Sequence, residues 1–272
     1  MKNSEKETST INDFLEALRQ QMERAPEGVD VSELEKALAK MQKPADGEDL
    51  TKIWFLLDRS GSMQSVAADV LGGYNSFVVE QAKASANATM TTIQFDSQNP
   101  FDVIGDGCEI GKVRDLTSET YTPRGATPLY DAIGKLIRRA DARVQKREDD
   151  GLPPEDQLIL IFTDGLENAS QEFTRKRIFN LIKDRSDRDW TFVFMGANQD
   201  SYVEGDKMGL IDGNVQNYAG TSDSVAMIFE SASRATRDYV GKARSQKAAD
   251  KERFFGDLKE AEEALRRARR QR

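Results

Sequence analysis

The sequence predicts a doubly wound, Rossmann-like α/β fold, in which helices cover both faces of a mostly parallel sheet. Two continuous apolar runs, residues 53–57 and 158–162, are typical of strands that are buried on both faces. Stretches with helical periodicity follow each run, and alternation of strand and helix favours a parallel sheet. The first run ends at Asp58, and Asp164 lies just beyond the second. Both carboxylates are therefore expected at the carboxyl edge of the sheet, where ligands bind in open α/β folds.

The other elements of this domain follow from the same periodicity, in chain order. β-like segments flank the turn residues 97–100, and the segment after position 149 is rich in Gly and Pro and separates a helix from the second apolar run. The expected helices span about 65–84, 128–146 and 172–184, and the further expected strands span 90–95, 101–104 and 190–195.

Helical segments flank the α/β domain on both sides. Apolar residues recur at helical spacing through residues 9–42, and Pro26 and Gly28 divide this stretch into a helical hairpin. From Ser222 onward there is no Pro and helical spacing continues. We therefore expect an N-terminal helical hairpin and linker at 1–47, an α/β domain at 48–220 and a C-terminal helical extension at 221–272.

The composition excludes several kinds of chemistry. The 272 residues include no His and one Cys, so a Ser–His–Asp triad, a Cys–His dyad, a His-ligated zinc site and an intrachain disulfide are all ruled out. Carboxylates and hydroxyls remain, and these are the ligands that hard metal ions prefer.

Charge and hydropathy restrict the partners. No run of about 18 apolar residues is present, so we expect no membrane span, and the first ten residues lack the apolar segment of a signal peptide. The last seven residues contain five Arg, but the formal net charge is −8 and no aromatic residue lies between those arginines. We therefore expect a cytoplasmic protein that does not bind nucleic acid.

Five oxygen-bearing side chains form the candidate metal site. Asp58, Ser60 and Ser62 alternate in a loop after the first apolar strand, Thr127 precedes an expected helix, and Asp164 follows the other apolar strand. Two carboxylates and three hydroxyls suit a hard divalent ion, most naturally Mg²⁺, with Mn²⁺ and Ca²⁺ as alternatives.

These five positions, in this order, resemble the metal-ion-dependent adhesion site of von Willebrand factor A (VWA) domains. The resemblance covers about residues 50–220, and the stretches 71–78, 163–170 and 194–200 are similar to small stand-alone bacterial and phage-encoded members. It implies that Ser60 and Ser62 bind the metal directly, that Asp58 and Asp164 act largely through water, and that Thr127 does either.

The resemblance also implies a function. The metal would keep one coordination position for an Asp or Glu of a partner protein, which in this family is often an AAA-type ATPase or an assembly factor. We therefore expect a binding module and not an enzyme.

Two alternatives stay open. One is a structural, self-assembling protein that associates through its terminal helices, with the metal only stabilising loops. The other is a magnesium-dependent phosphoryl-transfer enzyme, because Asp58-x-Ser60 is one substitution from the DxD of phosphoaspartate phosphatases. Ser60 is a poor proton donor where that chemistry needs a general acid, so we rank the enzyme last.

Overall fold

The computed structural model describes residues 50–84, 87–197 and 205–256. The expected N-terminal hairpin and the end of the C-terminal extension, residues 257–272, lie outside these described residues. The domain boundaries at 47/48 and 220/221 stay a prediction.

The described residues form a six-stranded sheet in the order β3-β2-β1-β4-β5-β6, which confirms the predicted α/β class. All neighbouring strands run parallel except β3, which pairs with β2 antiparallel at one edge. The two apolar runs became the central strands β1 and β4, which lie side by side. The strands are β1 (Thr51–Asp58), β2 (Ala88–Phe95), β3 (Asp102–Glu109), β4 (Asp156–Thr163), β5 (Thr191–Ala197) and β6 (Val215–Tyr218).

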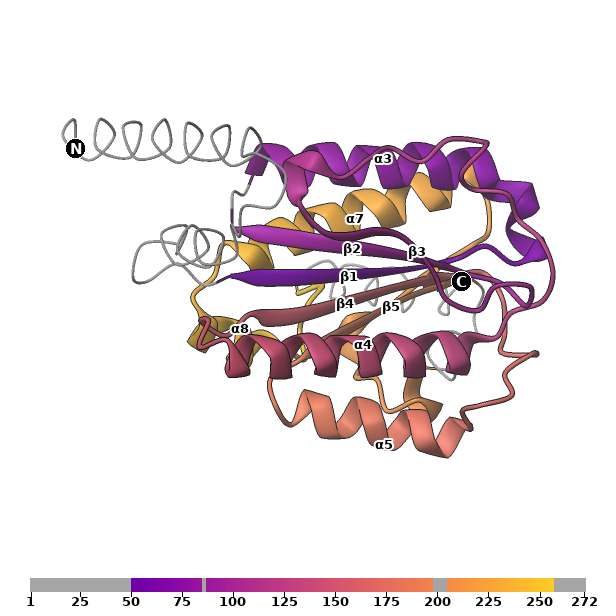
Figure 1. The fold of residues 1–272 in the computed structure, drawn as a ribbon. Helices are drawn as coiled ribbons and strands as arrows, with labels where there is room; N and C mark the ends of the chain where they lie inside the picture. The colour runs from indigo at the N-terminus through magenta and orange to yellow at the C-terminus, as the bar shows by residue number, and fades with distance from the viewer. Residues whose placement is uncertain (1–49, 85–86, 198–204, 257–272) are drawn as a thin grey trace, which may run out of the picture. The chain divides into compact units, whose positions relative to one another are not determined.

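Helices cover both faces of this sheet, as the sequence predicts. Helices α3 and α7 lie on one face, and α4 and α5 lie on the other (Figure 1). The main helices are α3 (Ala67–Ala84), α4 (Leu129–Asp149), α5 (Arg175–Ser186), α7 (Ser222–Val240) and α8 (Arg244–Asp250). Short 3-10 helices are η1 (Gly61–Val66), η2 (Ile110–Lys112) and η3 (Asp212–Asn214).

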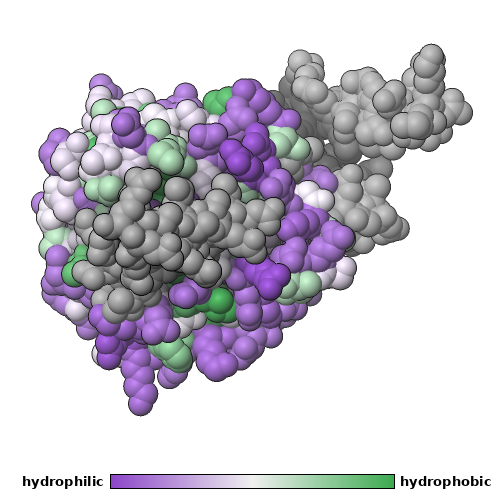
Figure 2. All heavy atoms as spheres, turned by 180° about the vertical axis from the view of Figure 1, so that it is seen from behind, coloured by the Kyte–Doolittle hydropathy of each residue, from purple (hydrophilic) through white to green (hydrophobic). Residues whose placement is uncertain are grey.

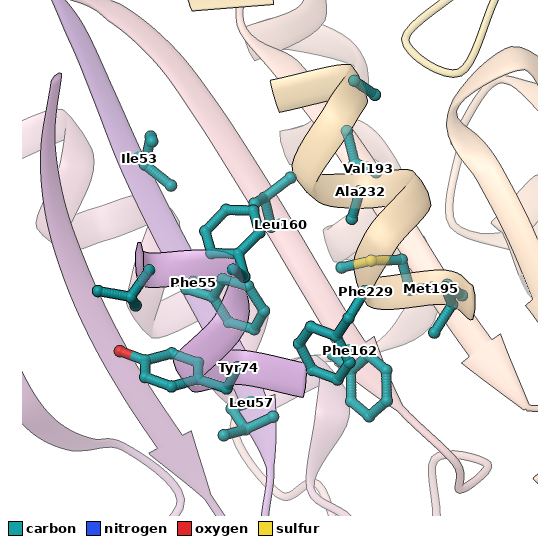
Figure 3. Close-up of a cluster of buried hydrophobic side chains, with 14 of the residues drawn as sticks. Ile53, Phe55, Leu57, Tyr74, Leu160, Phe162, Val193, Met195, Phe229 and Ala232 are labelled. Atoms are coloured by element: carbon teal, nitrogen blue, oxygen red, sulfur yellow. The ribbon is translucent and has the colours of Figure 1, made fainter. Parts of the chain in front are cut away.

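Aromatic side chains fill the core between the sheet and the α3–α7 layer (Figure 3). Phe55 of β1 packs edge-on against Tyr74 of α3, with ring centroids 5.4 Å apart. Phe162 of β4 packs against Phe229 of α7, with ring centroids 4.8 Å apart. Gly73 allows the two helices to approach closely, because a Cβ there would lie 2.3 Å from the Phe229 ring. Helix α7 therefore shares the core of the α/β domain.

The other face of the sheet carries a second core, which α4 and α5 close. Trp54 of β1 and Ile161 of β4 point to this face, because alternate residues of a strand face opposite sides. Both are almost fully buried, as are Leu136 of α4 and Ile178 of α5. Burial on both faces explains why β1 and β4 are continuous apolar runs.

Helix α8 is fixed to the domain by a buried cation. The Lys247 ammonium is almost fully buried and donates to Asp156 Oδ2 at 2.8 Å and to Thr51 Oγ1 at 3.0 Å. Arg244 donates to the other oxygen of Asp156 at 2.6 Å. The part of the C-terminal extension that the structure describes therefore packs on the sheet domain.

On the face that Figure 2 shows, hydrophilic residues predominate among the coloured atoms and apolar residues are scattered. In the described part of the chain, no helix combines the length and the hydropathy that crossing a membrane requires.

Candidate metal centre

Asp58 ends β1 and is fully buried. Both of its carboxylate oxygens accept hydrogen bonds from neutral groups. The backbone N–H of Ser60 donates to Oδ1 at 2.7 Å, and the hydroxyl of Thr163, at the end of β4, donates to Oδ2 at 2.5 Å. The carboxylate is thus oriented by the two central strands together.

Two serine hydroxyls join Asp58 to the second predicted carboxylate. The hydroxyl oxygens of Ser60 and Ser62 lie 3.1 Å apart, and Ser62 donates to Asp164 Oδ1 at 2.5 Å. Because β1 and β4 are parallel neighbours, their carboxyl ends meet at one edge of the sheet. This arrangement brings positions that are 102 residues apart into contact.

Thr127 completes the group from the loop that leads into α4. Its side chain is buried, and its hydroxyl lies against Gly165: a Cβ at Gly165 would be 2.8 Å from Thr127 Oγ1 and 3.5 Å from Ser62 Oγ. Glycine at 165 leaves this space to the two hydroxyls. The structure therefore brings all five predicted side chains to the same end of β1 and β4.

Both carboxylates lie in surroundings that disfavour negative charge. Burial raises the pKa of Asp58 to about 7, although hydrogen bonds from Thr163 and Ser60 act in the opposite direction. The charge of Asp164 raises the pKa of Asp58 further. Burial also raises the pKa of Asp164, against the hydrogen bond from Ser62. A bound cation would stabilise the charged form of both carboxylates and so oppose the effect of burial on their pKa.

The donor set fits a hard divalent ion. Within the described residues, no three His, Cys, Asp or Glu side chains cluster in a way that could hold a metal. The five predicted side chains instead supply two carboxylates and three hydroxyls, which are oxygen donors of the kind that Mg²⁺ prefers. Soft transition metals favour thiolate and imidazole ligands, and the sequence has no His.

Two tyrosines that the sequence analysis missed support the strand ends. The hydroxyl of Tyr121 donates to the backbone carbonyl of Asp58 at 2.7 Å, and the hydroxyl of Tyr218 donates to the carbonyl of Thr163 at 3.2 Å. Each tyrosine thus binds the last residue of one central strand. No local pattern predicts these contacts, since Tyr121 and Tyr218 come from a loop and from the edge strand β6.

The stretch after Asp164 is folded around carboxylates. Glu167 accepts the N–H groups of Ala169 and Ser170 and also the N–H of Tyr130 at the start of α4. Asp131 accepts three further amide groups from the same loop. These contacts fix the Asp164 loop to the helix that follows Thr127.

No protein-family model matches the sequence, and no curated protein sequence matches it. Similar solved structures exist. Proximal thread matrix protein 1 from the mussel byssus is 14% identical over 68% of this chain, with a TM-score of 0.50. The pilus adhesin SpaC from Lactobacillus rhamnosus GG is also 14% identical, over 72% of this chain, with a TM-score of 0.52. A von Willebrand factor type A structure from Catenulispora acidiphila matches at 12% identity over 74% of this chain, with a TM-score of 0.46.

The chain spans 47%, 31% and 42% of the length of these three structures, respectively. At such low identity the likeness shows the fold alone. The chain has a VWA-like fold, and the resemblance noted in the sequence is confirmed at this level.

Proposed function

We propose that this chain is a divalent-metal-dependent protein-binding module. Asp58, Ser60, Ser62, Thr127 and Asp164 would hold one Mg²⁺, with Mn²⁺ or Ca²⁺ as substitutes, and the ion would bind an Asp or Glu carboxylate of a partner protein. When bound, the ion supplies an electrophilic centre for that carboxylate.

The convergence of these side chains carries the proposal. Ser62 joins Ser60 at 3.1 Å and Asp164 at 2.5 Å, and the buried Asp58 is held by an amide and a hydroxyl. A buried carboxylate is costly unless a cation or strong hydrogen bonds compensate it. A metal ion at this point would offset that cost.

The exposure of the residues fits a binding surface. Asp58, Ser60 and Thr127 are at most 2% exposed, whereas Ser62 is exposed and forms the outer side of the group. A protein carboxylate can therefore approach from the side of Ser62. Hydroxyl ligands are neutral, so they leave the ion more attractive to an external anion than a set of carboxylates would.

The surroundings of Asp58 argue against the phosphoryl-transfer alternative. A nucleophilic carboxylate must reach its substrate, but Asp58 is fully buried and Thr163 occupies its Oδ2. The names of the two similar structures with TM-scores of at least 0.50, a pilus adhesin and a thread matrix protein, favour a binding or structural role. The described terminal helices, α7 and α8, pack on the sheet domain, so they lend no support to self-assembly.

Affinity capture from cells of the source organism tests the proposal. The tagged full chain is incubated with extract in Mg²⁺ and, in parallel, in EDTA. Ser62→Ala removes an exposed ligand and leaves the buried contacts of Asp58 in place, whereas Ser65→Ala removes a nearby exposed hydroxyl as the control. We expect a specific partner that is lost in EDTA and with Ser62→Ala but retained with Ser65→Ala. Retention in all four conditions would reject the proposal.

A further inference from the structure

Asp96, just after β2, is a fully buried carboxylate that binds two arginines. Its Oδ2 accepts Nε of Arg59 at 2.8 Å and Nε of Arg124 at 3.0 Å. Its Oδ1 accepts the backbone N–H groups of Gln98 and Asn99 at 2.7 and 2.9 Å. Burial raises the pKa of Asp96, but the two amides and the two arginines outweigh burial, so the pKa is lowered overall.

Arg59 links this carboxylate to the Asp58 loop, because it lies between Asp58 and Ser60. Its side chain is nearly buried and also contacts Gln94 at 2.8 Å and Asp102 at 3.0 Å through Nη1. Arg59, the second residue of the stretch Asp58–Ser62, therefore ties this loop through its side chain to residues of β2 and β3 and to Asp96.

Arg124 links the same carboxylate to the loop that carries Thr127. Its backbone N–H donates to the carbonyl of Arg59 at 2.8 Å. The next residue, Gly125, accepts the N–H of Gly61 at 3.0 Å and has a φ of +67°, a conformation that favours glycine. A carbon atom added at Gly125 would also lie 2.5 Å from Ser97 Oγ.

Ser97 closes the same junction next to Asp96. The N–H of Ser97 donates to the carbonyl of Ala126 at 3.0 Å, and the N–H of Ala126 donates to Ser97 Oγ at 2.9 Å. Three loops, those after β1 and β2 and the one before α4, therefore meet at Asp96.

We propose that Asp96, acting through Arg59 and Arg124, is the positioning residue that fixes the Thr127 loop against the Asp58–Ser62 loop. The inference deepens the proposed function, and its metal-binding readout rests on that function. Asp96 binds the side chains of Arg59 and Arg124, and the backbone of each arginine belongs to one of the two ligand loops. Their effect on a metal ion therefore passes through the position of Thr127.

Arg124→Gln separates positioning from charge. Removing a cation near a metal site strengthens metal binding if charge alone matters. Loss of positioning weakens it, and supporting partners of metal ligands are typically worth about 10–100-fold in affinity. Arg139→Gln is the matched control, because the Arg139 side chain is 40% exposed and pairs with Asp106, while Arg124 is 41% exposed and pairs with Asp96.

The first measurement is calorimetric titration of Mg²⁺ alone into the metal-stripped full chain. We expect Arg124→Gln to raise the Kd about tenfold, and Arg139→Gln to leave it unchanged. In a Thr127→Ala background, Arg124→Gln should have no further effect, since the two residues act through one element. Unchanged or tighter binding by Arg124→Gln, or an equal loss in the Thr127→Ala background, would overturn the inference.

The second measurement needs no metal. Amide hydrogen exchange in EDTA reports the bonds that Gly61 and Ala126 donate across the junction. We expect both amides to exchange about tenfold faster in Arg124→Gln than in Arg139→Gln. Unchanged exchange would overturn the positioning role whatever the titration gives. Failure of the unchanged protein to bind Mg²⁺ would instead contradict the proposed function, and the exchange rates would still decide the role of the Asp96–Arg124 ion pair.

Discussion

Thr127 and Asn168 hold each other by two reciprocal hydrogen bonds. The N–H of Thr127 donates to Asn168 Oδ1 at 2.8 Å, and the N–H of Asn168 donates to the carbonyl of Thr127 at 3.1 Å. The first residue precedes α4 and the second follows Asp164, so the pair ties together the loops that carry two of the proposed ligands.

Asn168→Ala should therefore weaken Mg²⁺ binding several-fold. It leaves the Thr127 amide without its acceptor, which costs about 1 kcal/mol. Asn168→Asp keeps a carboxylate oxygen in place of the amide oxygen and serves as the control. Calorimetric titration of both variants checks this, and equal losses in the two would mean that the Oδ1 contact is not what holds Thr127.

Asp58→Asn should abolish Mg²⁺ binding and at the same time stabilise the metal-free protein at pH 8. The folded-state pKa of about 7 lies above the ordinary value of 3.8, so ionising Asp58 costs folding free energy, and this cost is present in full above pH 7. Asn removes the charge and can still accept from the Ser60 amide. We expect a gain of up to about 4 kcal/mol in EDTA, measured by urea denaturation. If Asp58→Asn is clearly less stable than the unchanged protein in EDTA, the charge of Asp58 does not destabilise the metal-free fold. The metal would then have no such cost to offset.

Gly72 and Gly73 are neighbours in α3, and Ala should have opposite effects at the two positions. A Cβ at Gly73 would lie 2.3 Å from the Phe229 ring, whereas a Cβ at Gly72 meets nothing within 4 Å. Gly73→Ala should cost about 1–3 kcal/mol by forcing α3 and α7 apart. Gly72→Ala should gain up to about 1 kcal/mol of helix propensity. Denaturant unfolding of both variants measures the change in the free energy of unfolding. A decrease in both variants would show that α3 tolerates a side chain at neither position.

Because Lys52 is buried, we expect the free energy of unfolding to depend on pH. Burial, with a smaller contribution from Arg143, lowers the pKa of the Lys52 ammonium from 10.5 to about 7. Between these values the unfolded chain binds more protons than the folded chain, so the contribution of Lys52 to stability rises with pH from 7 to 10.5. Below pH 7 its destabilising effect is constant and largest.

Lys52→Met removes this group and isolates its effect. The variant should be more stable than the unchanged protein at pH 7, by a few kcal/mol, and this advantage should shrink by pH 9.5. Urea denaturation of both proteins at the two pH values measures the difference. A difference that stays constant or grows with pH would mean that the folded protein keeps Lys52 charged.

The sequence predicts those elements of the fold whose burial produces a regular pattern of apolar residues along the chain. Strands β1 and β4 are apolar throughout because both of their faces are covered. Strand β6 was missed because Val215–Tyr218 is four residues long and half polar, as befits a short edge strand. The expected helix at 65–84 is a 3-10 helix at its start, η1, which places the chain after Ser60 in a tighter turn.

Four candidate ligands, Asp58, Ser60, Ser62 and Asp164, were found from sequence because they follow the two apolar strands. Thr127 was found because it precedes an expected helix and completes the order that the VWA resemblance implies.

The residues that hold these ligands were not found. Thr163, Asn168 and Asp96 act on groups that are 28 to 105 positions away along the chain, and only the folded loops bring those partners together. Thr163 left a signal as a polar residue between an apolar run and Asp164, and Thr163 and Asn168 both lie in the family-like stretch 163–170.

Titration of Mg²⁺ into the metal-stripped full chain, with Asp58→Asn alongside, decides whether the five side chains form a metal site. We expect each chain of the unchanged protein to bind a single ion, and we expect the variant, although folded, to bind none. The absence of any saturable binding by the unchanged protein, or equal binding by the variant, would contradict the proposed metal site.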